Sequence, residues 1–174
     1  MKLKAQFLSD TVMMKTFFVQ LLILIGSAGA HEIKRGVHFI IPGTKWCGEG
    51  NIANHINDLG SEAATDICCR AHDFCNDIII AGGRRYNLIN WASYTRLNCH
   101  CDHDFYKCLK DANTPTSNLI GIAYFNLLGT QCFRKYYPIV RCIKRGMLPL
   151  RQCQQYQYSI TKDKIYQWFD EKDY

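Results

Sequence analysis

The protein has 174 residues, ten of them cysteine, and a formal net charge of +6 at pH 7. Residues 36–174 carry 16 basic and 13 acidic side chains. That excess is too small to indicate a nucleic-acid-binding protein, but it is compatible with an anionic membrane surface. This part of the chain is long enough for one domain with its own core, because domains commonly have about 100–150 residues.

The N-terminal segment has the features of a secretory signal peptide. Lys15 precedes the apolar run FFVQLLILI, and small residues follow the run up to Ala30. The run is much shorter than the roughly 20 apolar residues that span a bilayer, so we expect no transmembrane anchor. The predicted location of the protein is therefore extracellular, after secretion.

Two further features bear on the organisation of the chain. Residues 1–12 have no role in a signal peptide, so a translation start at Met13 or Met14 stays open. The pair Lys34-Arg35 marks a second candidate cleavage site, although two basic residues are also common on a solvated surface. We expect three segments: a signal peptide over 1–30, a short pro-segment over 31–36 and one functional domain over 37–174.

All ten cysteines lie after the signal peptide, and their number is even. In an oxidising compartment this pattern predicts five disulfides, each adding about 2–4 kcal/mol by restricting the unfolded chain. Spacing alone does not select the pairing. The cysteines occupy positions 47, 68, 69, 75, 99, 101, 108, 132, 142 and 153.

The first predicted element is a loop over 39–51, FIIPGTKWCGEGN, whose glycines permit unusual backbone angles. From 64 to about 80, cysteines and charged residues recur every three or four positions, which predicts a helix. Asp66 is placed to favour its start, and Gly82 and Gly83 are expected to end it.

Two more helices and a strand region are predicted further along the chain. Apolar residues and cysteines form one stripe over 93–110, and a shorter helical stretch covers 117–127. The remainder, 132–174, alternates Tyr, Ile and polar residues, which favours short strands. The predicted fold class is therefore mainly α with a small β region.

His72 and Asp73 are adjacent on the first predicted helix, which three neighbouring cysteines can clamp. Successive helical residues point about 100° apart, so the two side chains can serve different tasks. A neutral imidazole can take a proton from water, and a carboxylate can hold a hard cation such as calcium. The alternative is a solvated His-Asp pair with no chemical role.

The glycine loop offers further ligands for the same cation. Calcium takes six to eight oxygen ligands, and backbone carbonyls qualify where glycines let the chain curl around the ion. Trp46, Gly48 and Gly50 alternate along the loop and can aim three carbonyls at one point. With Asp73 supplying charge, the pattern indicates a calcium site.

Asp102, on the second predicted helix, is a candidate partner for His72. A buried carboxylate that accepts from one ring nitrogen fixes the tautomer and leaves the other nitrogen free as a base. The alternative is an exposed acid in the run CHCDHD, and the residues alone do not decide between the two.

The motif CCRAHDFC, preceded by WCGEG and followed by CHCD, resembles secreted phospholipase A2 of the group III, bee-venom-like type. The resemblance extends from IIPGTKWCGEGN through TRLNCHCDHDFYKCLK and IAYFNLLGTQC to KIYQWFD, nearly the whole mature chain. It implies a disulfide-rich secreted phospholipase A2 fold with two antiparallel disulfide-linked helices, a calcium loop and short C-terminal strands.

The resemblance also implies roles for individual residues. His72 is the implied general base, Asp102 its orienting partner and Tyr124 a hydroxyl donor to Asp102. The implied ligands of one calcium ion are the carbonyls of Trp46, Gly48 and Gly50 and the carboxylate of Asp73. The implied disulfides are Cys47–Cys69, Cys68–Cys108, Cys75–Cys101, Cys99–Cys132 and Cys142–Cys153.

Together these roles predict calcium-dependent hydrolysis of the sn-2 acyl ester of glycerophospholipids, giving lysophospholipid and free fatty acid. Water activated by His72 attacks the ester, and the sequence accordingly has no G-x-S-x-G nucleophile motif. The expected partner is a phospholipid membrane surface or aggregated phospholipid, and the enzyme is expected to be a monomer. Val37, Phe39–Ile41 and Ile78–Ile80 are candidates for an apolar rim that enters lipid, although such residues usually belong to a core.

Two other interpretations stay open. A catalytically weak or inactive toxin or receptor-binding protein on this scaffold would be expected to alter His72, Asp73 or a loop glycine, and all of these are present. A zinc protein would use the C-x-C cysteines with His100 and His103, but secretion favours disulfides. Glu49 and the two histidines beside Asp102 depart from the bee-venom pattern and change the local charge.

Overall fold

The computed structural model describes residues 39–147 and 150–174. The predicted signal peptide, pro-segment and first two residues of the domain lie outside the described residues. Within the described ranges, no helix is long and apolar enough to cross a membrane.

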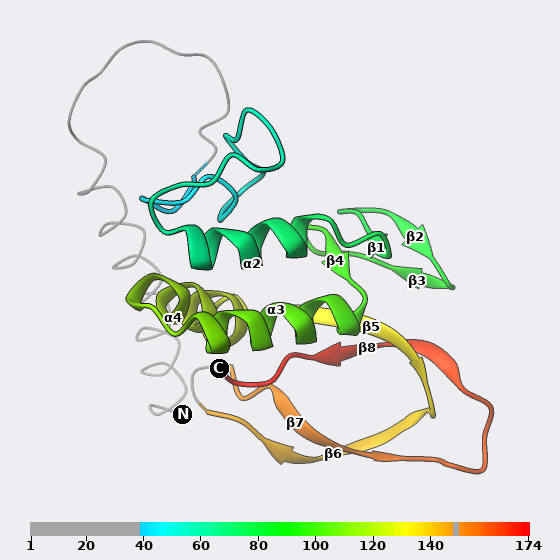
Figure 1. The fold of residues 1–174 in the computed structure, drawn as a ribbon. Coiled ribbons are helices and arrows are strands. Elements are labelled where there is room, and N and C mark those ends of the chain that lie inside the picture. The colour runs from blue at the N-terminus through cyan, green and yellow to red at the C-terminus, as the bar shows by residue number, and fades with distance from the viewer. Residues whose placement is uncertain (1–38, 148–149) are drawn as a thin grey trace, which may run out of the picture. The chain divides into compact units, whose positions relative to one another are not determined.

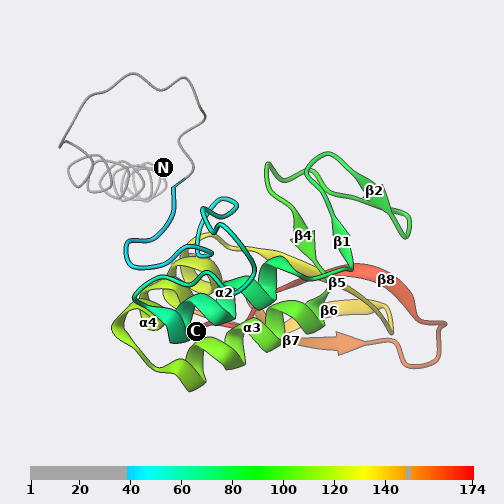
Figure 2. The ribbon, with the colours of Figure 1, turned by 45° about the horizontal axis from the view of Figure 1, so that its top comes forward.

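Two helices, α2 (Ala63–Asp73) and α3 (Cys99–Ala112), lie side by side in both views of the ribbon (Figures 1 and 2). Disulfides join Cys68 to Cys108 and Cys75 to Cys101. Cys68, within α2, bonds to a cysteine near the end of α3, whereas Cys75, just past the end of α2, bonds to one near the start of α3. The two helices therefore run antiparallel. The pair of antiparallel, disulfide-linked helices expected from the resemblance is present.

All ten cysteines are paired, and the pairing is the one that the resemblance implied. Three bridges fix the helices and the loop before them, while the other two tie down the strand region. The bridges are Cys47–Cys69, Cys68–Cys108, Cys75–Cys101, Cys99–Cys132 and Cys142–Cys153.

The first two helices are shorter than predicted, because residues after the first and before the second pair with each other as short strands. Helix α2 ends at Asp73, and β1 (Ile78–Ile79) pairs antiparallel with β4 (Arg96–Leu97). The predictions of helix up to 80 and from 93 were therefore wrong. Helix α3 begins only after Asn98, whose side chain accepts a hydrogen bond from the backbone N–H of His100 and caps the helix.

The third helical region agrees with its prediction and starts two residues earlier. Helix α4 (Pro115–Gly121) continues into a π-helical turn, η1 (Ile122–Leu127). Thr114 and Ser117 form a reciprocal capping box at the start of α4, and Pro115 suits the first helical position because its missing N–H would have no partner there.

The C-terminal part consists of antiparallel strand pairs, as predicted. Strand β5 (Gln131–Tyr136) pairs with β8 (Ile165–Asp170), and β6 (Ile139–Arg145) pairs with β7 (Cys153–Tyr158). A small ribbon, β2 (Arg84–Arg85) with β3 (Leu88–Ile89), follows β1. With four two-stranded sheets beside three α-helices, the described part is mixed α and β rather than mainly α.

The main core lies between the glycine loop and helices α2, α3 and α4. Leu109 and Phe125 are fully buried there, and burial of one such side chain stabilises the fold by about 1.5–3 kcal/mol. The last residue, Tyr174, packs on the same core, and its backbone N–H donates to Asn126 Oδ1 at 2.6 Å. The core therefore holds the chain end against the helices that carry the candidate site.

Candidate active site

His72 on α2 and Asp102 on α3 face each other between the antiparallel helices. The His72 Nε2–H donates to Asp102 Oδ1 at 2.7 Å, and the Asp102 side chain is only 1% exposed. The hydroxyl of Tyr124, on η1, donates to the same carboxylate oxygen at 2.8 Å. Three residues from three helices thus form one hydrogen-bonded chain.

The imidazole of His72 is held in place by aromatic rings as well as by Asp102. The ring of Phe105 stacks on it with centroids 4.3 Å apart, and Tyr124 meets it edge-on at 5.3 Å. Because Nε2 carries the hydrogen that points to Asp102, Nδ1 is the ring nitrogen with a free lone pair. No hydrogen bond from the described residues reaches Nδ1, so this atom is available to accept a proton.

A cleft of about 390 Å³ opens beside His72 along the two helices. Phe74 and Phe105 contribute apolar surface to its walls, and Asn76 and Asp104 contribute polar atoms. Tyr124 lies on the buried side of the dyad, where burial and the neighbouring Asp102 raise the pKa of its hydroxyl well above the usual value. The phenol therefore stays protonated and remains a donor.

Three carbonyls of the glycine loop accept no hydrogen bond from a donor in the described part of the protein. The carbonyl of Lys45 accepts from Ile52 N–H at 2.9 Å, and that of Cys47 accepts from Ile41 N–H at 2.8 Å. Among the described residues, no backbone or side-chain donor reaches three other carbonyls of this loop. These three carbonyls belong to Trp46, Gly48 and Gly50.

Asp66 holds the loop from the opposite side. Its fully buried carboxylate accepts from the backbone N–H groups of Trp46 at 2.7 Å, Lys45 at 2.9 Å and Gly60 at 2.8 Å. Sequence reasoning assigned Asp66 only to the start of its helix and missed this contact, because its donors lie up to 21 residues away in the chain. The carboxylate orients the first half of the glycine loop.

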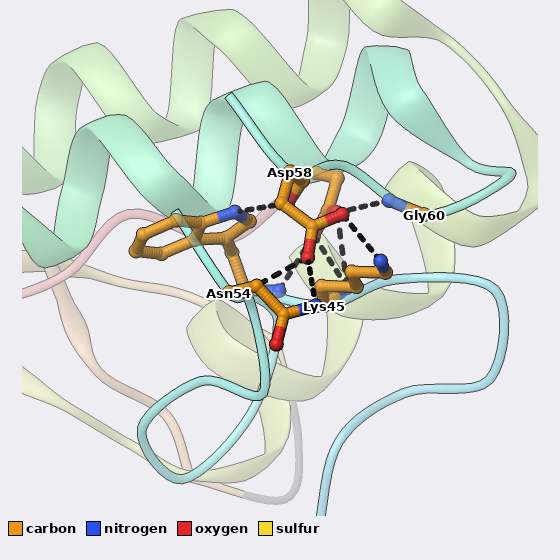
Figure 3. A network of polar contacts seen from close by, with 6 residues as sticks. Lys45, Asn54, Asp58 and Gly60 are labelled. Carbon is orange, nitrogen blue, oxygen red and sulfur yellow. Dashed lines mark hydrogen bonds and ion pairs between the residues drawn. The ribbon is translucent and has the colours of Figure 1, made fainter. Parts of the chain in front are cut away.

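A second carboxylate supports the outer side of the loop. Asp58 pairs with the Lys45 ammonium and accepts from the Asn54 backbone N–H at 2.8 Å, and its own carbonyl accepts from the Trp46 indole at 3.0 Å. Figure 3 shows Lys45, Asn54 and Asp58 in these contacts, with Gly60 beside them. The loop therefore rests on two acidic side chains.

The sequence profile of the phospholipase A2 family matches residues 40–136. A phospholipase A2 of Bombus pensylvanicus is 50% identical over 136 residues, which cover 78% of this chain and 99% of that protein. A phospholipase A2 of Apis mellifera is 43% identical over 147 residues, 84% of this chain and 85% of that protein. The chain belongs to the group III, bee-venom-like phospholipase A2 family.

The relatives extend beyond bees. The acidic phospholipase A2 PA4 of Heloderma suspectum is 42% identical over 95 residues, 55% of this chain and 67% of that protein. Membership of the phospholipase A2 family makes this chain an enzyme by class, and its disulfide-bonded framework agrees with that membership.

Asp73, the acidic candidate ligand, follows His72 directly. Partial burial raises the pKa of its carboxyl to about 6; His72 opposes that rise and the charge of Asp66 adds to it. Within the described part of the chain, no lysine or arginine forms an ion pair with Asp73. In this phospholipase A2 family member, the Asp73 carboxylate therefore lies next to the His72–Asp102 pair with no lysine or arginine of the described residues paired to it.

Gly48 has no room for a side chain. A Cβ at this position would lie 2.0 Å from the Phe39 carbonyl oxygen and 2.9 Å from Ile40 Cα. Any other residue would force the loop away from the preceding strand-like segment. The glycine that the sequence pattern selected as a ligand is therefore also required by the packing of the loop.

The structure disagrees with a zinc site in the C-x-C segment. Cys99 and Cys101 are both in disulfides, and the His100 ring bonds to Asn98 Oδ1 at 3.0 Å. Cys99 and Cys132 approach Glu171 closely enough for a shared metal, but the two sulfurs are bonded to each other and offer no thiolate. That interpretation is excluded for the described residues.

Proposed function

We propose that the protein catalyses calcium-dependent hydrolysis of the sn-2 acyl ester of glycerophospholipids, giving a lysophospholipid and a free fatty acid. The observation that carries the proposal is the His72–Asp102–Tyr124 hydrogen-bonded chain next to a loop with three carbonyls that lack protein donors. Family membership supports the same reaction class.

In the proposed reaction His72 is the general base. Its Nδ1 takes a proton from a water molecule while that water attacks the ester carbonyl carbon. The Asp102 carboxylate, 2.7 Å from Nε2, stabilises the imidazolium that results and keeps the ring in the required tautomer. Tyr124 fixes the position of Asp102, and the ring later returns its proton to the leaving alkoxide.

The residues of the loop fit one calcium ion. Calcium prefers carbonyl and carboxylate oxygens, and the proposed ligands are the carbonyls of Trp46, Gly48 and Gly50 together with the carboxylate of Asp73. When bound, calcium supplies positive charge that polarises the ester carbonyl and stabilises the negative charge developing on its oxygen. The uncompensated charge of Asp73 and the carbonyls without donors both support this assignment.

We further propose that the enzyme is secreted after removal of residues 1–30, that residues 31–36 form a short pro-segment, and that residues 37–174 act as a monomer on phospholipid surfaces. The residues of the predicted apolar rim differ in exposure. Phe39 and Ile80 are 46% and 60% exposed, whereas Ile79 is buried. Phe39 and Ile80 are therefore the candidates for contact with lipid. Val37 lies outside the described residues.

The experiment that tests the proposed reaction is product analysis with a phosphatidylcholine that carries different acyl chains at sn-1 and sn-2. We expect mass spectrometry to find the sn-2 fatty acid and the sn-1 lysophospholipid in equal amounts. Release of the sn-1 chain would contradict the proposed position of attack. A folded, disulfide-intact protein that releases neither chain would instead favour an inactive, receptor-binding protein on this scaffold.

A further inference from the structure

Trp91 is a large apolar side chain that the fold leaves in water. It is 84% exposed, more than any other large hydrophobic residue of the described ranges, whereas Trp46 is buried in the main core. Trp91 lies in the loop between β3 and β4, and Ile80, directly after β1, is also exposed. Single exposed apolar residues are common, whereas a contiguous apolar patch marks a binding surface.

Asn90 ties the backbone at Ile80 to the loop that carries Trp91. Its side chain is fully buried, and its amide donates to the carbonyls of Ile80 at 3.3 Å and Tyr94 at 2.7 Å. Its Oδ1 accepts from the Ala92 N–H at 3.1 Å. We call the three exposed residues that it brings together, Ile80, Trp91 and Tyr94, the Trp91 patch.

The backbone under the Trp91 patch is also well ordered. The Gly82 N–H donates to the Asn90 carbonyl at 2.9 Å, and the Asn90 N–H donates to the Gly83 carbonyl at 2.9 Å. The Gly83 N–H donates to the Ile80 carbonyl at 2.8 Å, which closes a tight turn. A surface that is already held in one conformation loses little entropy when it binds a partner.

Basic side chains accompany the Trp91 patch. Arg84 and Arg85 form β2 and are both exposed. Arg85 pairs with Asp77 at 3.0 Å, whereas Arg84 forms no ion pair within the described part of the chain. Residues 78–98 contain three arginines and no acidic residue. The charge near the patch is therefore complementary to an anionic surface.

The Trp91 patch follows the end of α2 that carries His72. Both views show β1, β4 and the β2–β3 ribbon beyond this end of the helix (Figures 1 and 2). The His72 carbonyl accepts from the Cys75 N–H at 3.0 Å, and the exposed Phe74 between them lines the cleft. Exposed apolar side chains thus occur both at the cleft and at the strands that follow it.

We propose that the Trp91 patch, together with Arg84, inserts into the surface of a phospholipid bilayer and gives the protein a preference for anionic lipid. The inference rests on the proposed function, in which a bilayer carries the substrate. Tryptophan and tyrosine favour the boundary between headgroups and acyl chains, where a guanidinium can bind phosphate. A water-soluble polyanion would contact the arginines but leave the apolar side chains in water, so a bilayer fits the patch better.

Vesicle flotation tests the insertion of Trp91 without any need for catalysis. The vesicles contain ether-linked phosphatidylcholine and phosphatidylglycerol, which have no ester to cleave, and the buffer contains excess chelator. We expect Trp91→Ala to lower the partition coefficient about tenfold, because burial of the indole ring is lost.

Ile160→Ala is the matched control, because Ile160 is 74% exposed in the turn between β7 and β8. We expect its partition coefficient to stay within about twofold of wild type. A partition coefficient of W91A equal to that of wild type, or equal losses for W91A and I160A, would overturn the proposal. Conversion of a dimer to a monomer by W91A, with vesicle binding unchanged, would overturn it in favour of contact with a second copy.

Arg84→Gln tests the preference for anionic lipid. We expect about fivefold weaker binding to the vesicles that contain phosphatidylglycerol, since one basic residue near an anionic surface contributes about that factor. Binding to vesicles of phosphatidylcholine alone should not change. Lys162→Gln, which removes an exposed charge between β7 and β8, is the control and should match wild type on both. Equal binding of R84Q and wild type to the anionic vesicles would overturn the preference.

Hydrolysis rates separate this inference from the proposed function. We expect W91A to be about tenfold slower than wild type on dilute ester vesicles, but within about twofold on a short-chain phosphatidylcholine dispersed as monomers. An equal loss on both substrates would overturn a role in surface binding. A protein that binds vesicles through Trp91 but releases no fatty acid would contradict the proposed function alone.

Discussion

Replacement of His72 by glutamine is expected to lower phospholipid hydrolysis by about 10²–10⁴-fold, the usual contribution of a general base. Glutamine is similar in length, and its amide can still donate to Asp102, but it cannot accept a proton from water at neutral pH. Calcium affinity should be unchanged, because the loop carbonyls and Asp73 are untouched. Initial rates on mixed vesicles and calcium titration by calorimetry measure the two quantities separately.

His103→Gln is the matched control, since His103 is an exposed histidine on α3 one residue from Asp102. We expect its rate to stay within about twofold of wild type, as is usual for an exposed side chain outside the site. A folded H72Q protein that keeps more than about a tenth of wild-type activity would show that another group takes the proton.

Replacement of Asp66 by asparagine is expected to destabilise the protein and to weaken calcium binding together. The carboxylate accepts from three backbone N–H groups, and an amide would turn its own NH₂ towards some of these donors. Each buried donor left without an acceptor costs about 1–3 kcal/mol, so we expect a loss of about 3 kcal/mol in unfolding free energy. Calcium affinity should fall by about tenfold or more, because the loop is no longer held in its binding conformation.

The substitution Asp58→Asn distinguishes the effect of Asp58 on the loop from the effect of Asp66. Asp58 contacts the Lys45 ammonium and Asn54 near the surface, where an asparagine can still accept a hydrogen bond. We expect a clearly smaller change in both Tm and calcium affinity than for D66N. The role assigned to Asp66 would be contradicted by a D66N protein whose calcium affinity equals that of wild type.

The sequence predicts the parts of this structure that depend on short-range patterns and on a recognisable motif. The His72–Asp102 pair, the Tyr124 donor and all five disulfide pairs occur together in the structure as the resemblance implied. The motif predicts these contacts because the order of its cysteines determines which disulfides hold the two helices together.

The errors concern places where tertiary pairing overrides local pattern. The helical spacing of residues around Cys68 extends in the sequence as far as Ile78. In the structure the helix ends at Asp73, and Ile78 instead pairs with Leu97 in a strand. The role of Asp66 depends on donors about 20 residues away, so no local pattern can reveal it.

The most direct test of the central claim is fatty-acid release from sn-2-labelled phospholipid vesicles in excess chelator, followed by addition of excess calcium to the same sample. We predict no release above background in chelator and full activity once calcium is restored, with the disulfides intact throughout. Release that continues unchanged in chelator would contradict the assignment of the glycine loop and Asp73 as a catalytic calcium site.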